Sequence, residues 1–285
     1  MADLSCLVRL IRPINCAMVG FAVLVGEAIV FKTLFPLPSI LGFVTGFTIT
    51  GSSMVSNDYW DLAVDRVNNP DRPIPSGRVK PREAIALTII LSAIGLGAAS
   101  VTYLPTTLIL ASGGLGMFLL YNYRAKQLGL LGNILVSASI ALPLVYGGMI
   151  QPPTQGSANS LALLVLFDVM IFLSNTGREV TKGICDVEGD RVRAVSTVAL
   201  KRGERAAALT SAALYLSAVA MTPLPWLLGL VGWLYLPLVA VTDIGFIASS
   251  FILLRDYSSE NALKVKRIVL IWMLLGLLSF VAGAL

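Results

Sequence analysis

Three aspartates and one asparagine stand close together at the end of an apolar run, in residues 57–65. If the helix of that run continues, each residue turns by about 100°. Asn57, Asp61 and Asp65 then fall within an arc of about 80°, and Asp58 lies slightly outside it. Like charges one turn apart repel each other, so a bound cation is the simplest way to stabilise this face. Oxygen ligands without a neighbouring histidine or cysteine favour Mg²⁺ over Zn²⁺.

A second acidic segment repeats this arrangement later in the chain. Asp186 and Asp190 follow another apolar run and are again one helical turn apart. A solvated helix end is the simpler explanation of a single carboxylate. It does not account for two such segments, each at the end of a long apolar run. The sequence therefore predicts two acidic helix ends that face each other.

Composition restricts the class of protein. Of the 285 residues, 56% are hydrophobic and 13% are charged, and the mean hydropathy is +0.82. No soluble domain needs so much apolar surface, so we predict an all-α, polytopic membrane protein. The absence of histidine excludes histidine-based acid–base catalysis and histidine ligation of a metal or haem. The three cysteines have no CxxC spacing and indicate neither a disulfide framework nor a zinc site.

The apolar runs predict nine membrane spans in a single transmembrane domain, residues 1–285. A short amphipathic helix in residues 1–12 is expected to lie in the membrane interface. The first apolar run lacks a cleavage signature and is expected to be a retained span. Two polar loops, 66–82 and 178–204, interrupt the apolar pattern. The predicted spans are 13–31, 38–57, 84–102, 106–123, 129–149, 160–177, 205–222, 232–254 and 267–284.

The basic residues predict how the chain is oriented. With nine spans, all of the 21 lysines and arginines except Lys32 fall on one side of the membrane. By the positive-inside rule that side is cytoplasmic. The N-terminus and both acidic segments are then expected at the cytoplasmic face of the cell membrane. Any chemistry should take place on that side.

Cationic side chains accompany both acidic segments. In the second segment cations and anions recur every fourth residue and form one helical stripe, Arg178, Lys182, Asp186 and Asp190. Ion pairing on a solvated helix would explain one such stripe, at about 0.3–0.5 kcal/mol per pair, but not its counterpart. Carboxylates that hold Mg²⁺ beside arginine and lysine suit a diphosphate.

A diphosphate beside spans rich in leucine, isoleucine and valine indicates an isoprenyl diphosphate, whose tail would lie among the spans. Mg²⁺ and cationic side chains would stabilise the charge on the departing diphosphate. A nucleophile would then capture the allylic carbocation. Such a reaction needs little acid–base machinery, which agrees with the absence of histidine. Tyr121 is one aromatic side chain that can shield the cation, although packing is the more common role of such a residue.

The motif N-D-x-x-D-x-x-x-D in residues 57–65, followed by D-R-P-I-P-S-G-R in residues 71–78, resembles the first signature of the UbiA superfamily of intramembrane prenyltransferases. Residues 186–190 resemble its second signature. The resemblance implies an all-α ring of nine transmembrane helices around a central cavity with a lateral opening to lipid. It implies that Asp61, Asp65, Asp186 and Asp190 are catalytic and, with Asn57, bind Mg²⁺ and diphosphate. It implies diphosphate contacts from Arg72, Lys126 and Lys182.

Three further segments, 12–15, 121–133 and 178–190, resemble the branch of this family that makes archaeal ether lipids. That resemblance implies Mg²⁺-dependent transfer of a geranylgeranyl group from its diphosphate to the sn-2 hydroxyl of geranylgeranylglyceryl phosphate. The expected partners are an isoprenyl diphosphate, a lipid-like acceptor and membrane lipid. Neither nucleic acid nor an obligate protein partner is expected. The residues expected to bind substrate are Asn15, Asn57, Asp58, Arg72, Arg78, Tyr121, Asn122, Lys126, Arg178 and Lys182.

Two other functions fit parts of the pattern. A prenyltransferase for an aromatic acceptor, such as a quinone or chlorin precursor, would share the same acidic segments. A cation-coupled transporter would instead need charges near the middle of several spans. Glu27, Asp168 and Asp243 are the acidic candidates there, and they form no obvious relay.

Overall fold

The computed structural model describes residues 4–103, 105–123, 128–152, 157–187, 190 and 196–284, and all regular structure in these residues is helical. The predicted all-α class is therefore confirmed. The helices are α1 (Leu4–Ile11), α2 (Pro13–Phe31), α3 (Pro36–Trp60), α4 (Leu62–Asn68), α5 (Pro81–Ser100), α6 (Thr106–Tyr123), α7 (Leu130–Gly148), α8 (Ala158–Cys185), α10 (Val198–Arg202), α11 (Glu204–Met221), α12 (Leu224–Leu227), α13 (Tyr235–Arg255) and α14 (Ser259–Ala284).

Local sequence signals explain several helix boundaries. A proline begins α2, α3 and α5, where its fixed φ suits the first turn and its missing N–H removes no helical hydrogen bond. In α1, Cys6 and Leu10 are buried, whereas Leu4 and Val8 are exposed. Apolar side chains therefore lie on the outer face of α1 as well as on the face that packs against the bundle. Arg12 has a φ of 55°, so α1 and α2 are joined by a left-handed turn.

The number of spans differs from the prediction by one. Among the described residues, eight helices are long and apolar enough to cross a membrane, where the sequence predicted nine. The missing span is α6. Threonines begin this 18-residue helix and Tyr121, Asn122 and Tyr123 end it, so its polar ends fall within the length needed to cross the membrane. It still packs against α3, α5 and α7 and takes its place in the bundle.

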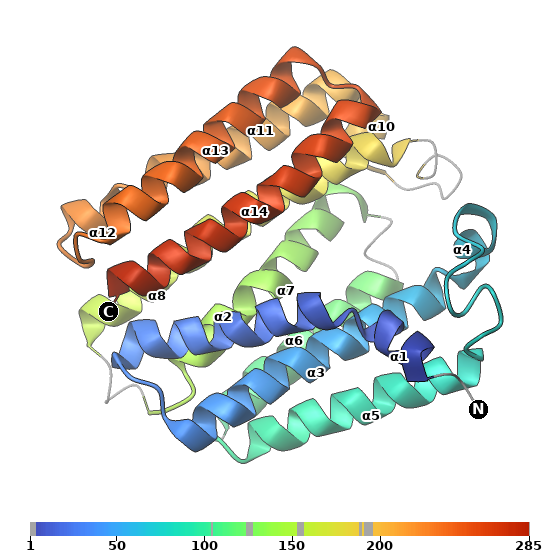
Figure 1. Ribbon diagram of the computed structural model, residues 1–285, viewed down its shortest axis with the longest axis horizontal. Coiled ribbons are helices and arrows are strands. Elements are labelled where there is room, and N and C mark those ends of the chain that lie inside the picture. The colour runs from blue at the N-terminus through green and yellow to red at the C-terminus, as the bar shows by residue number, and fades with distance from the viewer. Residues whose placement is uncertain are drawn as a thin grey trace.

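The helices form a closed ring. Each of α2, α3, α5, α6, α7, α8, α11, α13 and α14 packs against the next, and α14 packs back against α2. The N-terminus, α1, α4 and α10 lie at one end of the bundle, and α12 and the C-terminus lie at the other (Figure 1). Polar loops and both acidic segments therefore gather at the N-terminal end. The predicted ring architecture is confirmed.

Buried acidic side chains within the spans tie helices together. The carboxylate of Glu27 accepts hydrogen bonds from the backbone N–H of Phe35, at 2.9 Å, and from Ser39 Oγ, at 2.8 Å. It thereby joins the end of α2 to the start of α3. Asp243 on α13 accepts a hydrogen bond from Thr222 Oγ1 at 2.7 Å, which joins α13 to the end of α11. Both carboxylates have structural partners, as expected for ionisable groups at membrane depth.

Two glycines bring α2 and α7 into backbone contact. A Cβ atom on Gly26 would lie 1.9 Å from the carbonyl oxygen of Leu144, and one on Gly147 would lie 1.9 Å from the carbonyl oxygen of Val23. Small residues permit such close packing of membrane helices. We expect Gly26→Ala to lower the free energy of unfolding by at least about 1–3 kcal/mol, because backbone atoms cannot move aside as a side chain can.

The Gly26→Ala substitution has a matched control on α6. A Cβ atom on Gly113 would meet nothing within 4 Å, so Gly113→Ala should not lower stability. Thermal denaturation of both variants in mild detergent measures the difference. Equal melting temperatures would show that the α2–α7 contact does not depend on glycine.

Candidate active site

One large cavity of about 1190 Å³ lies inside the ring. Its polar wall is at the end of the bundle that holds α4, and its remaining wall is largely apolar, with residues such as Met170, Leu277 and Phe280. Eleven of the fourteen residues expected to form the site line this cavity: Asn15, Asn57, Asp61, Asp65, Arg72, Tyr121, Asn122, Arg178, Lys182, Asp186 and Asp190. An elongated apolar ligand with an anionic head fits such a distribution of wall chemistry.

The first acidic segment keeps its predicted face despite a break in the helix. Helix α3 ends at Trp60 and α4 begins at Leu62, with Asp61 between them. The N–H of Asp61 still bonds to the carbonyl of Asn57 at 2.9 Å, and that of Asp65 to the carbonyl of Asp61 at 2.8 Å. Asn57 Nδ2 also donates to Asp61 Oδ2 at 3.2 Å. The helical spacing therefore continues through the bend, and all three residues reach the cavity.

Arginines neutralise the two most buried carboxylates of this segment. Asp58 and Asp65 are only 4% and 2% exposed. Arg72 Nη1 lies 2.6 Å from Asp65 Oδ2 and 3.5 Å from Asp58 Oδ1, and Arg12 Nη2 lies 2.7 Å from the same Asp58 oxygen. Asn69 Nδ2 donates to the other oxygen of Asp65 at 3.1 Å. Arg72 thus connects the turn-rich loop to the carboxylates that precede it.

Three expected substrate-binding residues do not line the described cavity wall. Asp58 lies behind it, beside a smaller pocket that it shares with Arg12 and Arg72. Arg78 donates from Nε to Ser76 Oγ at 2.9 Å and also to the carbonyl oxygen of Asp71, so it braces the loop from its exposed side. Lys126 lies outside the described residues. In this structure Asp58 and Arg78 therefore support the loop around the cavity, and their expected contact with substrate stays a prediction.

The second acidic segment continues from α8. This helix starts at an N-cap, where Ser157 Oγ accepts a hydrogen bond from the N–H of Ser160, and it ends at Cys185. Asp186 follows directly, and the N–H of Asp190 bonds to its carbonyl at 2.8 Å. The predicted stripe of two cations and two anions therefore lies along one wall of the same cavity. Asp61 and Asp186, far apart in the sequence, line a common space.

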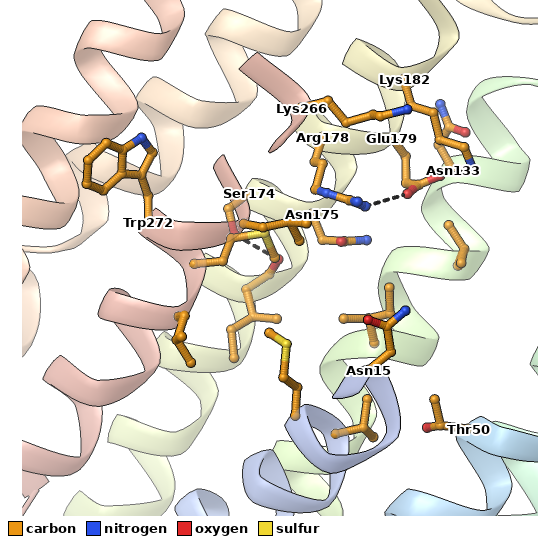
Figure 2. A pocket seen from close by; sticks show the side chains of 18 of the residues that line it. Asn15, Thr50, Asn133, Ser174, Asn175, Arg178, Glu179, Lys182, Lys266 and Trp272 are labelled. Carbon is orange, nitrogen blue, oxygen red and sulfur yellow. Dashed lines mark hydrogen bonds and ion pairs between the residues drawn. The ribbon is translucent and has the colours of Figure 1, made fainter. Parts of the chain in front are cut away.

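A cluster of charges one to two turns before Asp186 was only partly predicted. Arg178 and Lys182 surround the buried carboxylate of Glu179, with N–O distances of 3.1 Å and 3.5 Å. Lys266 of α14 joins them from across the cavity (Figure 2). Glu179 carried a local signal, since it lies three residues before Lys182 in the same helix. Lys266 carried none, because only the fold brings α14 to α8.

Asparagines on the wall also hold the helices that carry it. Asn122 Nδ2 donates to the carbonyl of Ser53 at 3.0 Å and to Ser56 Oγ at 2.8 Å, which joins α6 to α3. Asn175 Nδ2 donates to Ser137 Oγ at 3.1 Å, which joins α8 to α7. These amides fix the positions of the acidic and basic groups beside them. Sequence reasoning found Asn122 but missed Asn175.

The donor set suits a metal ion that is shared with a substrate. No three acidic or cysteine side chains among the described residues are already gathered around one point. Mg²⁺, however, binds through one or two carboxylates, several waters and substrate phosphates rather than in a closed protein cage. Oxygen donors on both sides of one cavity, without histidine, fit that mode. The candidate ligands are Asn57, Asp61, Asp65, Asp186 and Asp190.

Comparison with known proteins decides the family. Residues 18–282 match the sequence profile of the UbiA prenyltransferase family. The chain belongs to this family. The UbiA assignment, together with eight helices able to cross a membrane in the described residues, makes the chain a multi-pass membrane prenyltransferase.

Individual UbiA proteins resemble the chain over nearly its whole length. Digeranylgeranylglyceryl phosphate synthase of Methanopyrus kandleri is 37% identical over 277 residues, which are 97% of this chain and 98% of that protein. A solved structure of a digeranylgeranylglyceryl phosphate synthase matches with a TM-score of 0.80 at 30% identity, over 99% of this chain and 98% of that one. A UbiA homologue from Archaeoglobus fulgidus, bound to GPP and Mg²⁺, shares the fold at a TM-score of 0.68 and 16% identity, over 96% of this chain and 99% of that one.

Proposed function

We propose that this UbiA protein transfers a geranylgeranyl group from geranylgeranyl diphosphate to the sn-2 hydroxyl of geranylgeranylglyceryl phosphate. The observation that carries the proposal is one cavity lined by both acidic helix ends, by cations and by a long apolar wall. The names of the relatives support this choice of acceptor, since digeranylgeranylglyceryl phosphate is the product of such a transfer. The polar and apolar parts of the cavity wall support this choice of donor, which has an anionic head on an apolar chain.

The proposed reaction exchanges one C–O bond for another. The bond between the allylic carbon and the diphosphate oxygen breaks, and its electron pair leaves with the diphosphate. A lone pair of the sn-2 hydroxyl oxygen forms the new ether bond, and the hydroxyl proton is released. Mg²⁺, held by one or two carboxylates from the five candidate ligands, would supply positive charge to the departing diphosphate. The solved complex of the Archaeoglobus fulgidus homologue with GPP and Mg²⁺ supports this choice of metal.

The side chains of this protein would position the donor and the acceptor next to each other. Asp61 and Asp186 would approach the donor from the C-terminal ends of two different helices, and Arg72 adds positive charge beside Asp65. The apolar wall excludes water from the isoprenyl chain and from the cation that forms on it. Such positioning and electrostatic stabilisation account for most of the barrier reduction in reactions with charged leaving groups. No histidine is needed for these roles.

An acceptor panel tests the proposal. Purified protein is supplied with labelled geranylgeranyl diphosphate, Mg²⁺ and one of three acceptors, geranylgeranylglyceryl phosphate, 4-hydroxybenzoate or a chlorin, and the product is identified by mass. We expect digeranylgeranylglyceryl phosphate, with no product after chelation of Mg²⁺ and full recovery when Mg²⁺ is restored. Transfer to an aromatic acceptor alone would contradict the proposed acceptor. Ion flux into liposomes without any transfer would favour a transporter.

We further propose that the whole chain, 1–285, is one transmembrane domain whose N-terminus and active site are cytoplasmic. The family match over residues 18–282 and the packing of α14 on α2 support a single domain. The concentration of lysine and arginine at the end that carries the polar loops supports the orientation. In sealed vesicles with the cytoplasmic face outward, added geranylgeranyl diphosphate should be consumed. Vesicles of the opposite orientation should be inactive.

A further inference from the structure

The cluster around Glu179 carries more positive charge than its own carboxylate can balance. Arg178, Lys182 and Lys266 supply three cations and Glu179 supplies one anion. Glu179 is 8% exposed and accepts contacts from Arg178 Nη1 and Lys182 Nζ. Among the described residues, Lys266 makes no ion pair, although it lies within electrostatic range of Glu179. Asp186, one turn from Lys182, is the next carboxylate along the chain, and three cations against these two anions leave one positive charge that favours an additional anion.

One donor atom in this cluster has no partner. Arg178 Nε is buried and makes no hydrogen bond within the described residues, while its side chain is 19% exposed and faces the cavity. A buried charged donor without a partner is unfavourable unless a ligand completes it. Arginine presents several N–H groups in a plane, which match the oxygens of a phosphate. The missing partner is thus an oxyanion inside the cavity.

The cluster begins one helical turn before the second acidic segment, and Lys182 lies within electrostatic range of Asp186. Lys182 and Arg178 precede Asp186 by four and eight residues on α8, which correspond to about 6 Å and 12 Å along the helix. Figure 2 shows Lys266 reaching toward Lys182 and Arg178 from the other side of the pocket. An anion held here would therefore lie deeper in the cavity than one held at Asp186 and Asp190.

The acceptor of the proposed reaction carries a phosphate group that needs a binding site of its own. Its phosphate ester is joined to the reacting hydroxyl through only two carbon atoms. When that hydroxyl approaches the allylic carbon of the donor to about 3–3.5 Å, the two phosphate groups must lie several ångströms apart. A spacing of one to two helical turns satisfies this requirement. A phosphate monoester carries a charge of about −1.5 to −2 at neutral pH, which offsets the excess of the cluster.

We propose that Arg178, Lys182 and Lys266 bind the phosphate of the acceptor, while the acidic helix ends bind the donor diphosphate. This inference rests on the proposed function. Glu179 is a positioning residue, because it holds Arg178 and Lys182 through its two oxygens. The family resemblance implies a different partner for Lys182, the donor diphosphate. The two assignments predict different changes in kinetics.

Lys266→Met separates them, because it removes the charge and keeps the length of the side chain. We expect kcat/KM for geranylgeranylglyceryl phosphate to fall about 10-fold or more, the effect of one lost charge-assisted contact. The dephosphorylated acceptor, geranylgeranylglycerol, should react at the same rate in the variant and the parent protein. The KM for geranylgeranyl diphosphate should not change. Lys266→Arg should restore the preference for the phosphorylated acceptor.

Lys264 provides the matched control. It lies two residues away on the same helix, pairs with Glu260 at 2.8 Å, and is 65% exposed. Lys264→Met should leave kcat/KM for both acceptors and the KM for geranylgeranyl diphosphate unchanged. An increase in the KM for geranylgeranyl diphosphate in Lys266→Met, with no loss of acceptor preference, would overturn the inference in favour of a donor contact. An unchanged preference with unchanged donor kinetics would overturn it as well.

Binding without turnover distinguishes failure of this inference from failure of the proposed function. Geranylgeranylglyceryl phosphate is titrated against the protein without donor or Mg²⁺, and sn-glycerol 1-phosphate serves as a soluble probe of the head group alone. We expect Lys266→Met to weaken binding of both about 10-fold. If the parent protein transfers no geranylgeranyl group but Lys266→Met still weakens binding, the proposed reaction is rejected and the phosphate site is supported. Equal binding by variant and parent would reject the site whatever the reaction.

Discussion

Asp61→Asn and Asp186→Asn are each expected to abolish prenyl transfer in a protein that remains folded. Asparagine keeps the size of the side chain and can still hydrogen-bond to Asn57, so the bend between α3 and α4 should persist. What it removes is the negative charge that holds Mg²⁺ against the diphosphate. We expect kcat to fall by about 10²–10³-fold or more, as when one preorganised electrostatic contact to a leaving group is lost. Turnover of labelled geranylgeranyl diphosphate measures the loss.

Asp71 supplies the control for both substitutions. It lies in the loop after the first acidic segment, is exposed and does not line the main cavity. Asp71→Asn should retain parental turnover. Melting temperatures and gel-filtration profiles in detergent should be the same for all three variants. Parental turnover in Asp61→Asn or Asp186→Asn would contradict the proposed metal–diphosphate site.

Arg72→Met is expected to reduce both stability and activity. Arg72 is the shared partner of two carboxylates, Asp65 at 2.6 Å and Asp58 at 3.5 Å. Without it, the amide of Asn69 is the one side-chain partner left to Asp65 among the described residues, while Asp65 is only 2% exposed. Loss of a partner from a fully buried pair costs about 3–5 kcal/mol. Because the Arg72 side chain is 36% exposed, solvent screening lowers our expectation to about 1–3 kcal/mol.

A second substitution separates the two effects of Arg72. In the Arg72→Met background, Asp65→Asn removes the uncompensated charge, so stability should be regained while transfer stays low. Arg66→Met is the matched control, since Arg66 is exposed and makes no ion pair among the described residues. Its melting temperature and turnover should equal those of the parent. If Arg72→Met melts at the parental temperature, the buried carboxylates do not depend on it.

The four-residue spacing predicted much of the site because helical hydrogen bonds continue through the bend after α3 and past the end of α8. Asn57, Asp61 and Asp65 follow one another by a single turn, and the stripe from Arg178 to Asp190 does the same, so local geometry fixes each set. The repetition of the acidic pattern at the end of a second apolar run predicted that the two sets face each other, and both line the same cavity. The long apolar runs predicted the membrane spans, whereas the ring was implied by the resemblance to UbiA proteins. The prolines at the helix starts follow from their fixed φ.

Several other features that depend on contacts between distant segments were not predicted. Lys266 reaches the cluster around Glu179 only because α14 packs against α8. The sequence placed Asp58 near the predicted face, yet Arg12 and Arg72 bury it behind the cavity wall. Arg78 braces its own loop because the turn directs it toward Asp71 and Ser76. The span count was wrong by one because α6 combines the length of a span with polar ends.

The most direct measurement is binding of a non-hydrolysable donor, geranylgeranyl thiodiphosphate, to the parent protein and to the same Asp61 and Asp186 variants, with and without Mg²⁺. If the two helix ends bind one metal-bound head group, the parent protein binds the donor tightly only with Mg²⁺. Each variant should then lose most of the increase in affinity that Mg²⁺ produces. Tight binding to Asp186→Asn, or metal-independent binding to the parent, would contradict a shared site.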